Sequence, residues 1–130
     1  MNKVFVYGSL LKGMGNSGLL KDSKLLGKSE ITGFTMLDLG WFPGIILDKS
    51  TKTSVQGEVY EVTDETLNRL DHLEGYNPYN PESGLYNKIV VSTSFGNAVV
   101  YVYNTHGYTN SDHVVSTGDW KSYYNGKLNK

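Results

Sequence analysis

The sequence has 130 residues, of which 38% are hydrophobic and 12% aromatic, and its formal net charge is −1. The near balance of 12 Lys and Arg against 13 Asp and Glu excludes the broad basic surface of a general nucleic-acid-binding protein. Without cysteine the chain can form no disulfide, thiol nucleophile or thiolate zinc site, which is compatible with a cytoplasmic location.

The length is close to that of an average domain and predicts a single domain over residues 1–130. The longest apolar stretches are far shorter than the roughly 20 residues that cross a bilayer, so we expect no membrane partner. Ten tyrosines and fifteen glycines indicate a protein rich in β-sheet.

The first half of the chain consists of β-branched and aromatic runs interrupted by glycines. A glycine-containing loop is expected over Gly8–Gly18, a short helical turn over Leu19–Leu26 and a turn over Gly40–Gly44. Strands are predicted at Lys3–Tyr7, Glu30–Leu39, Ile45–Leu47 and Val55–Val62.

The second half contains the one strong helix, Asp64–Glu74, which Thr63 or Asp64 can cap and Gly75 ends. A proline-containing loop, a hairpin, a polar loop and a short C-terminal helix follow. These are expected at Asn77–Gly84, at Tyr86–Ser94 with Asn97–Tyr103, at His106–Ser116 and from Gly118-Asp119-Trp120 onward. This order predicts an α+β fold, and a sheet curled into a small mixed barrel would protect its edges.

Glu74 is the most informative single residue. It shares a helix face with Leu67 and Leu70 and lies at the negative end of the helix, immediately before Gly75. Apolar surroundings and the helix dipole would both raise its pKa, which is a property of acid–base catalysts. The alternative is a rim glutamate that reaches solvent or pairs with a tyrosine hydroxyl.

Two neighbours of Glu74 are weaker candidates. Asp71 is expected to be solvated or to help pack the helix, and His72 is expected at the surface. Neither position carries the combination of an apolar face and a helix end that distinguishes Glu74.

The loop after the first strand is the second candidate site. In Tyr7-Gly8-Ser9-Leu10, a glycine at the strand end allows successive backbone N–H groups to converge on an anion. The alternative is a tight turn without a ligand, and no Lys-Ser/Thr signature of a P-loop follows. The segment Gly13–Asn16 can be either a flexible loop or a lid.

Other combinations of polar residues do not form a convincing site. His106 and His113, with Asp112, lack a third good ligand, so no metal is predicted. A triad of Ser9, His106 and Asp112 lacks the supporting G-x-S-x-G elbow. The sequence cannot place Glu82 at the distance that paired-carboxylate glycoside hydrolysis requires.

The order of the motifs along the chain identifies a protein family more specifically than any single motif does. They are VFVYGSLLKGMGNSGLL at the start, then GEVY, LDHLEGY, Tyr86 before KIVVS, VVYVY and STGDW. This series resembles the gamma-glutamylcyclotransferase-like superfamily over nearly the whole chain. It is most similar to the gamma-glutamylamine cyclotransferase or AIG2-like branch, although Ser9 stands where that branch often has threonine.

The resemblance implies a compact mixed barrel with a cavity at one mouth. It implies a small-molecule γ-glutamyl substrate, whose α-amine attacks its own γ-carbonyl to give 5-oxoproline and a free amine without cofactor or metal. The catalytic acid–base falls on Glu74 and the backbone cradle on Tyr7, Gly8, Ser9 and Leu10.

Two further residues are assigned to the cavity on the same basis. Tyr86 is expected to border it and to hydrogen-bond Glu74 or substrate. Asn16 is expected either to orient a substrate carboxylate or to cap its loop. A binding module of the same fold, or a hydrolase using Glu74 with Glu82 or Asp71, is the alternative function. The oligomeric state is not predicted.

Overall fold

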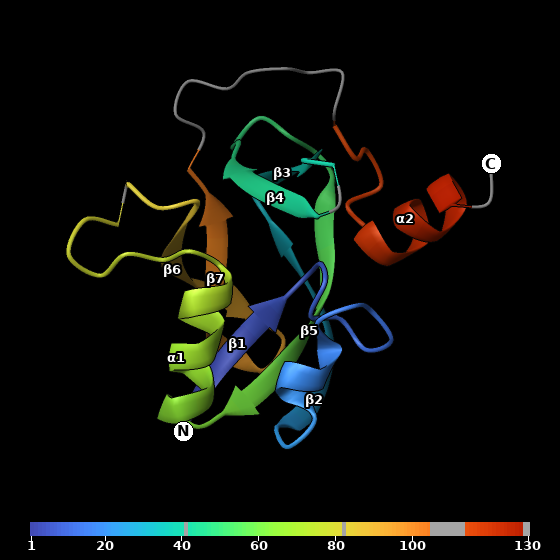
Figure 1. Cartoon of the computed structure of the whole chain (residues 1–130). Coiled ribbons are helices and arrows are strands. Elements are labelled where there is room, and N and C mark those ends of the chain that lie inside the picture. The colour runs from blue at the N-terminus through green and yellow to red at the C-terminus, as the bar shows by residue number, and fades with distance from the viewer. Residues whose placement is uncertain (41, 82, 105–113, 129–130) are drawn as a thin grey trace.

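The computed structural model describes every residue except 41, 82, 105–113 and 129–130 (Figure 1). The strands are β1 (Asn2–Val6), β2 (Lys24–Thr32), β3 (Phe34–Asp38), β4 (Pro43–Leu47), β5 (Ser54–Val62), β6 (Tyr86–Thr93) and β7 (Gly96–Tyr103). The helices are the 3-10 helix η1 (Ser17–Leu20) and the α-helices α1 (Asp64–Leu73) and α2 (Trp120–Leu128).

Strand β1 lies at the centre of a five-stranded sheet in the order β2-β5-β1-β7-β6. It pairs with β5 antiparallel and with β7 parallel, so that Val4 faces both Tyr60 and Val99. Alternate β1 side chains enter two hydrophobic clusters: Val4 packs with the residues beneath α1, and Phe5 packs on the opposite side. The continuous apolar run at the start of the chain therefore reflects burial on both faces.

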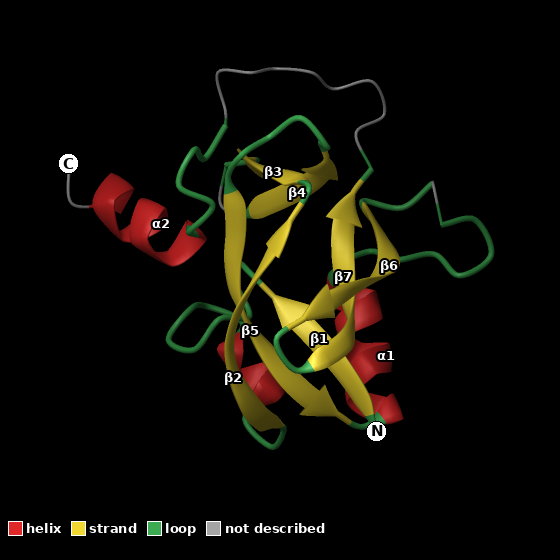
Figure 2. Cartoon of the chain, turned by 180° about the vertical axis from the view of Figure 1, so that it is seen from behind, coloured by secondary structure: helices red, strands yellow, loops and turns green. Residues whose placement is uncertain are grey.

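Helix α1 lies against one face of the sheet, and α2 lies on a different side of the molecule from α1, near the C-terminus (Figures 1 and 2). Thr63 caps α1 by accepting a hydrogen bond from the Thr66 N–H. Leu70 is fully buried beneath the helix. Gly75, with a φ of +66°, allows the chain to turn out of the helix. The prediction of a main helix in this segment is confirmed.

A second, two-stranded sheet of β3 and β4 completes the strand structure. The single strand predicted over Glu30–Leu39 is wrong, because Gly33 adopts a φ of +84° and separates β2 from β3. The carbonyl of Gly33 accepts a hydrogen bond from the Asp48 N–H, which fixes this turn. The break lets the chain leave the large sheet and form the small one.

The predicted helical turn over Leu19–Leu26 is also partly wrong. The helical segment ends at Leu20, and Leu25 already pairs with Tyr60 of β5. Pairing with a neighbouring strand outweighs the weak local preference of these residues for a helical turn.

The α+β fold class is confirmed, but the expected barrel is not closed. The sheet curls so that its edges approach, with Ser94 donating its N–H to the Ser29 Oγ at 3.1 Å. Within the described part of the chain, no backbone ladder joins β2 to β6. The curled sheet therefore has a seam that side chains bridge.

The short C-terminal helix is confirmed as α2. Asp119 caps it by accepting a hydrogen bond from the Ser122 N–H at 3.2 Å. Trp120 is buried in the same cluster as Phe5, so it packs this segment against the sheet. Among the described helices, none has the length and apolar character needed to span a membrane.

Candidate active site

A cavity of about 280 Å³ opens beside the C-terminal ends of β1 and α1. It is lined by Phe5, Val6, Tyr7, Gly8, Ser9, Leu10, Asn16, Phe42, Pro43, Leu73, Glu74, Leu85, Tyr86 and Tyr101. Every residue that the sequence predicted as catalytic or substrate-binding is among them: Tyr7, Gly8, Ser9, Leu10, Asn16, Glu74 and Tyr86. Segments far apart in the sequence thus meet around one hollow of small-molecule size.

The loop after β1 forms one wall of the cavity. The carbonyls of Gly8 and Ser9 accept hydrogen bonds from the N–H groups of Leu11 and Asn16, at 3.0 and 2.8 Å. Among the described residues, no backbone group accepts from the N–H groups of Ser9 and Leu10. The loop is therefore held by its carbonyls, and within the described part of the chain the consecutive N–H donors of Ser9 and Leu10, two residues that line the cavity, have no backbone acceptor.

Glycine is required at position 8 because the Pro43 ring packs close to its backbone, and not because the backbone adopts an unusual φ. A Cβ atom at this position would lie 2.6 Å from the Cγ of Pro43, so the proline ring occupies the space of a side chain. The loop after β1 therefore packs directly on the start of β4. Both residues of this contact line the cavity.

Asn16 forms hydrogen bonds with Ser9, near the start of the same loop. Its side-chain amide donates to the Ser9 Oγ at 3.0 Å, and its backbone N–H donates to the Ser9 carbonyl. These two contacts agree with the loop-capping alternative. The side chain nevertheless lines the cavity, so a direct contact with a ligand is still a prediction.

Three buried tyrosines form the floor. Tyr7 donates its hydroxyl to the Tyr101 carbonyl at 2.6 Å, and Tyr86 donates to the Pro43 carbonyl. The sequence suggested Glu74 as one possible partner of the Tyr86 hydroxyl. In the structure, the partner is the Pro43 carbonyl instead. Burial, followed by the nearby charge of Glu74, raises the pKa of Tyr86 well above its usual range. The floor tyrosines accordingly stay protonated at neutral pH.

Glu74 lies at the C-terminal cap of α1, where its N–H donates to the Leu70 carbonyl at 2.9 Å. Its side chain is half-buried in the cavity wall. Desolvation by this burial raises the pKa of the carboxyl group from 4.5 to about 7. Near neutral pH this group exists in both protonation states, so it can accept a proton and later return it.

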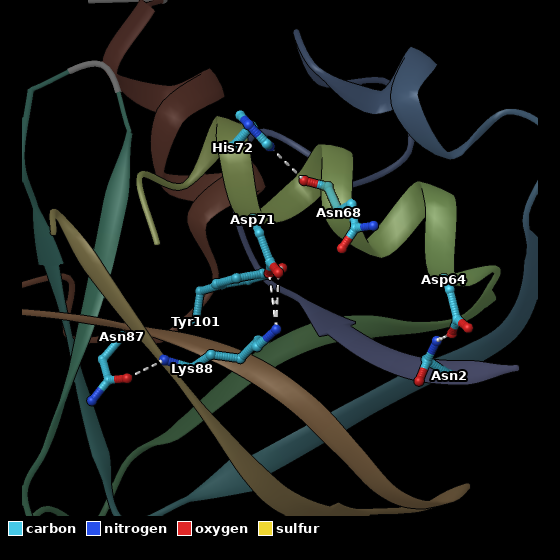
Figure 3. Close-up of polar contacts among 8 residues, drawn as sticks. All are labelled: Asn2, Asp64, Asn68, Asp71, His72, Asn87, Lys88 and Tyr101. Atoms are coloured by element: carbon cyan, nitrogen blue, oxygen red, sulfur yellow. Dashed lines mark hydrogen bonds and ion pairs between the residues drawn. The ribbon is translucent and has the colours of Figure 1, made fainter. Parts of the chain in front are cut away.

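Asp71, one helical turn before Glu74, ties the end of α1 to the sheet (Figure 3). Its carboxylate lies 3.0 Å from the Lys88 ammonium of β6 and accepts the Tyr101 hydroxyl of β7. The same ammonium lies 4.6 Å from the centre of the Tyr76 ring. Asp71 therefore packs the helix, in agreement with the sequence-based alternative, and this network holds the segment that carries Glu74.

The remaining candidates do not join the cavity. His72 is exposed, as predicted, and its ring contacts the Asn68 carbonyl of its own helix. The predictions for His106, Asp112, His113 and Glu82 concern residues outside the described part of the chain. Within the described ranges, no cluster of three or more metal-ligating side chains occurs.

The sequence reasoning missed the apolar lining of Phe42, Pro43, Leu73 and Leu85, as well as Tyr101. Leucine and phenylalanine give no chemical signal in a sequence, because most of them fill the core. The proximity of Leu73 to Glu74 and of Leu85 to Tyr86 was the available clue.

Comparison with known proteins identifies the family of this chain. The sequence profile of the family described as "Gamma-glutamyl cyclotransferase, AIG2-like" matches residues 4–122. The chain belongs to this family. It is 33% identical to the gamma-glutamylcyclotransferase family protein YtfP of Escherichia coli, over 91% of this chain and 95% of that protein.

Two further relatives extend the comparison. The gamma-L-glutamyl-butirosin B gamma-glutamyl cyclotransferase of Niallia circulans is 34% identical, over 95% of this chain and 78% of that enzyme. The crystal structure of an uncharacterized protein from Pyrococcus horikoshii superposes with a TM-score of 0.77 and 25% identity, covering 99% of this chain and 98% of that one. The predicted superfamily is thus confirmed, and its general reaction is a γ-glutamyl cyclotransfer.

Proposed function

We propose that this protein is a γ-glutamyl cyclotransferase that acts on a γ-glutamyl amine or a γ-glutamyl amino acid. The α-amine of the γ-glutamyl group attacks the γ-carbonyl carbon of the same group. A new C–N bond closes the five-membered ring, the original amide C–N bond breaks, and the products are 5-oxoproline and a free amine.

The observation that carries the proposal is the meeting of Glu74 with the Gly8–Leu10 loop at one cavity. The substrate α-amine is mostly protonated near neutrality and must lose a proton before it can attack. A carboxylate whose pKa is raised to about 7 is a stronger base than an exposed glutamate. Glu74 accepts that proton and then donates it to the departing nitrogen as the amide bond breaks. The attacking nitrogen loses a second proton when it becomes the lactam nitrogen, and this proton passes to the released amine, which leaves as an ammonium ion, so protons balance over the cycle.

The unpaired N–H groups of Ser9 and Leu10 supply the second requirement. They can bind either the α-carboxylate of the substrate or the oxyanion that develops on the γ-carbonyl oxygen. A single donor to such an oxyanion contributes about 3 kcal/mol to the transition state. Tyr7, Gly8 and Asn16 hold the shape of this wall.

Because the attack is intramolecular, the cavity mainly has to hold the substrate in a ring-forming conformation. The buried floor of Tyr7 and Tyr86 limits the conformations of the γ-glutamyl chain. The reaction as proposed needs no enzyme nucleophile and passes through no cofactor.

The family membership supports the reaction class, and the butirosin-related enzyme supports the cyclising outcome. The role of each residue is our inference from the site. Ser9, where the amine-acting branch often has threonine, does not alter the backbone donors on which the proposal rests.

The test is to incubate the purified protein with a panel of γ-glutamyl amines and γ-glutamyl amino acids and to measure 5-oxoproline. We expect product from at least one member, and Glu74→Gln is expected to lose nearly all turnover while still binding that substrate. Binding without product from any member would instead support a non-catalytic binding module. Full activity of Glu74→Gln would exclude this residue as the acid–base.

A further inference from the structure

Two segments that the proposed reaction does not use meet at one residue of the loop after β1. In the GEVY segment of β5, the Glu58 Oε1 accepts a hydrogen bond from the Lys12 N–H at 2.9 Å. At the start of α2, the Lys121 Nζ donates to the Lys12 carbonyl at 2.6 Å. The backbone of Lys12 is therefore held at both its N–H and its carbonyl, by side chains from two different elements.

The two elements that supply these side chains are themselves joined. The Gln56 N–H of β5 donates to the Gly118 carbonyl, just before α2, at 2.8 Å. A Cβ atom at Gly118 would overlap the Ser54 carbonyl oxygen, so the chain packs directly on β5 here. Both views show α2 on the same side of the molecule as the loop after β1 (Figures 1 and 2). Glu58 and Lys121 thus extend from one connected framework to the loop.

Lys12 directly follows the part of the loop that lines the cavity. The hydrogen bonds that the loop carbonyls accept from Leu11 and Asn16 join the loop to itself, so they fix its shape. The two bonds at Lys12 join it to β5 and α2 and so fix its position. The buried side chains of Leu10 and Leu11 also anchor the loop, but apolar packing lacks the directionality of a hydrogen bond.

The charge of Glu58 distinguishes a positioning role from a direct electrostatic effect on the substrate. Among the described residues that line the cavity, neither Glu58 nor Lys121 occurs, so both act from behind its wall. By its charge alone, Glu58 disfavours an anion bound at this wall, and its removal would help the reaction. By its hydrogen bond to Lys12, it holds the loop that binds the anion, and its removal would harm the reaction. The two roles predict opposite changes in rate.

We propose that Glu58 and Lys121 are positioning residues, which clamp Lys12 so that the preceding loop keeps its N–H donors in place at the cavity wall. This inference rests on the proposed function, in which the N–H groups of Ser9 and Leu10 bind the α-carboxylate or the oxyanion of the substrate. It gives the GEVY segment and the start of α2 a part in the reaction, although both lie outside the cavity.

The first test measures kcat/KM for 5-oxoproline release, with the γ-glutamyl amine or amino acid that the native protein turns over fastest. Glu58→Ala is expected to lower kcat/KM at least about tenfold, because the loop donors shift. Glu58→Gln keeps an oxygen acceptor without the charge and is expected to stay within about threefold of the native value. Glu61→Ala is the matched control, because it removes another half-buried carboxylate from β5 and is expected to change little.

Unchanged or increased kcat/KM in Glu58→Ala, with the fold intact by circular dichroism, would overturn the inference and leave the proposed function standing. Equal losses in Glu58→Ala and Glu58→Gln would also overturn it, because the charge and not the hydrogen bond would then matter. No product from the native protein with any γ-glutamyl amine or amino acid would instead contradict the proposed function, and the clamp with it.

The second test asks whether the two side chains act as one clamp. Lys121→Met removes the donor to the Lys12 carbonyl and is expected to lower kcat/KM several-fold. In the double variant with Glu58→Ala, we expect a loss smaller than the product of the two single losses, because either change already frees the loop. A loss equal to that product or larger would show independent roles and would overturn the clamp.

Discussion

Burial of an ionisable carboxyl group at Glu74 should be measurable as a loss of stability at high pH. Its pKa is raised from 4.5 to about 7 in the folded protein because the side chain is desolvated. Between these two pH values the folded state binds more protons than the unfolded state. The free energy of unfolding contributed by this group therefore falls as the pH rises through this window.

The size of the effect follows from the shift. A rise of the pKa from 4.5 to about 7 corresponds to about 3 kcal/mol of stability that is present below pH 4.5 and lost above pH 7. Glu74→Gln keeps the shape of the side chain and cannot ionise. The variant should therefore be more stable than the native protein by up to about 3 kcal/mol at pH 8, which corresponds to about 10 °C in Tm.

The assay is urea denaturation of both proteins at several values between pH 4 and pH 8. The advantage of Glu74→Gln should be large at pH 8 and should disappear toward pH 4. Glu65→Gln is the control: its carboxylate is 76% exposed and pairs with Arg69, so we expect a loss of at most about 0.5 kcal/mol. Two results would refute the conclusion that the Glu74 carboxyl group is desolvated. One is a Glu74→Gln variant that is less stable than the native protein at pH 8, and the other is a difference in free energy of unfolding that does not change with pH.

Three further outcomes follow from the same geometry. On the acidic side of its pH profile, kcat/KM should rise with pH through an ionisation near 7, and full activity persisting at pH 5 would contradict a base with the pKa of Glu74. Gly8→Ala places a Cβ atom 2.6 Å from the Pro43 Cγ, so the loop must move. We expect urea denaturation to show a loss of about 1–3 kcal/mol in the free energy of unfolding, and steady-state assays to show a KM raised at least about tenfold. Asp71→Asn removes the charge that binds Lys88 at 3.0 Å, and denaturation should report a loss of about 1–3 kcal/mol.

Local sequence patterns predicted the elements that they determine by themselves. The strand at Val4 and Phe5 is recognisable because β-branched and aromatic residues occupy both of its faces. Helix α1 is recognisable because Thr63 caps it and Gly75 ends it. In contrast, Leu25 belongs to β2 only because β5 lies beside it, and nothing in the local sequence identifies that partner.

The same distinction applies to the site. Glu74 was predicted from its own helix, because a carboxyl group on an apolar face at a helix end conflicts with two local preferences. The hydrogen bond from Tyr86 to the Pro43 carbonyl joins residues 43 positions apart, and only the folded chain reveals it. The leucines that line the cavity, Leu73 and Leu85, also required the fold, since Leu85 can be linked to the site only once the folded chain places it beside Gly75 at the end of α1.

The most direct test of the proposed reaction is to run it in water enriched in ¹⁸O and to measure whether solvent oxygen enters the product. Cyclisation in the cavity of Glu74 and the Gly8–Leu10 loop uses the α-amine of the substrate as the nucleophile, so no solvent oxygen enters the product. Mass spectrometry should detect unlabelled 5-oxoproline and the free amine in equal amounts. Glutamate carrying one ¹⁸O atom would show hydrolysis instead and would contradict the proposed reaction.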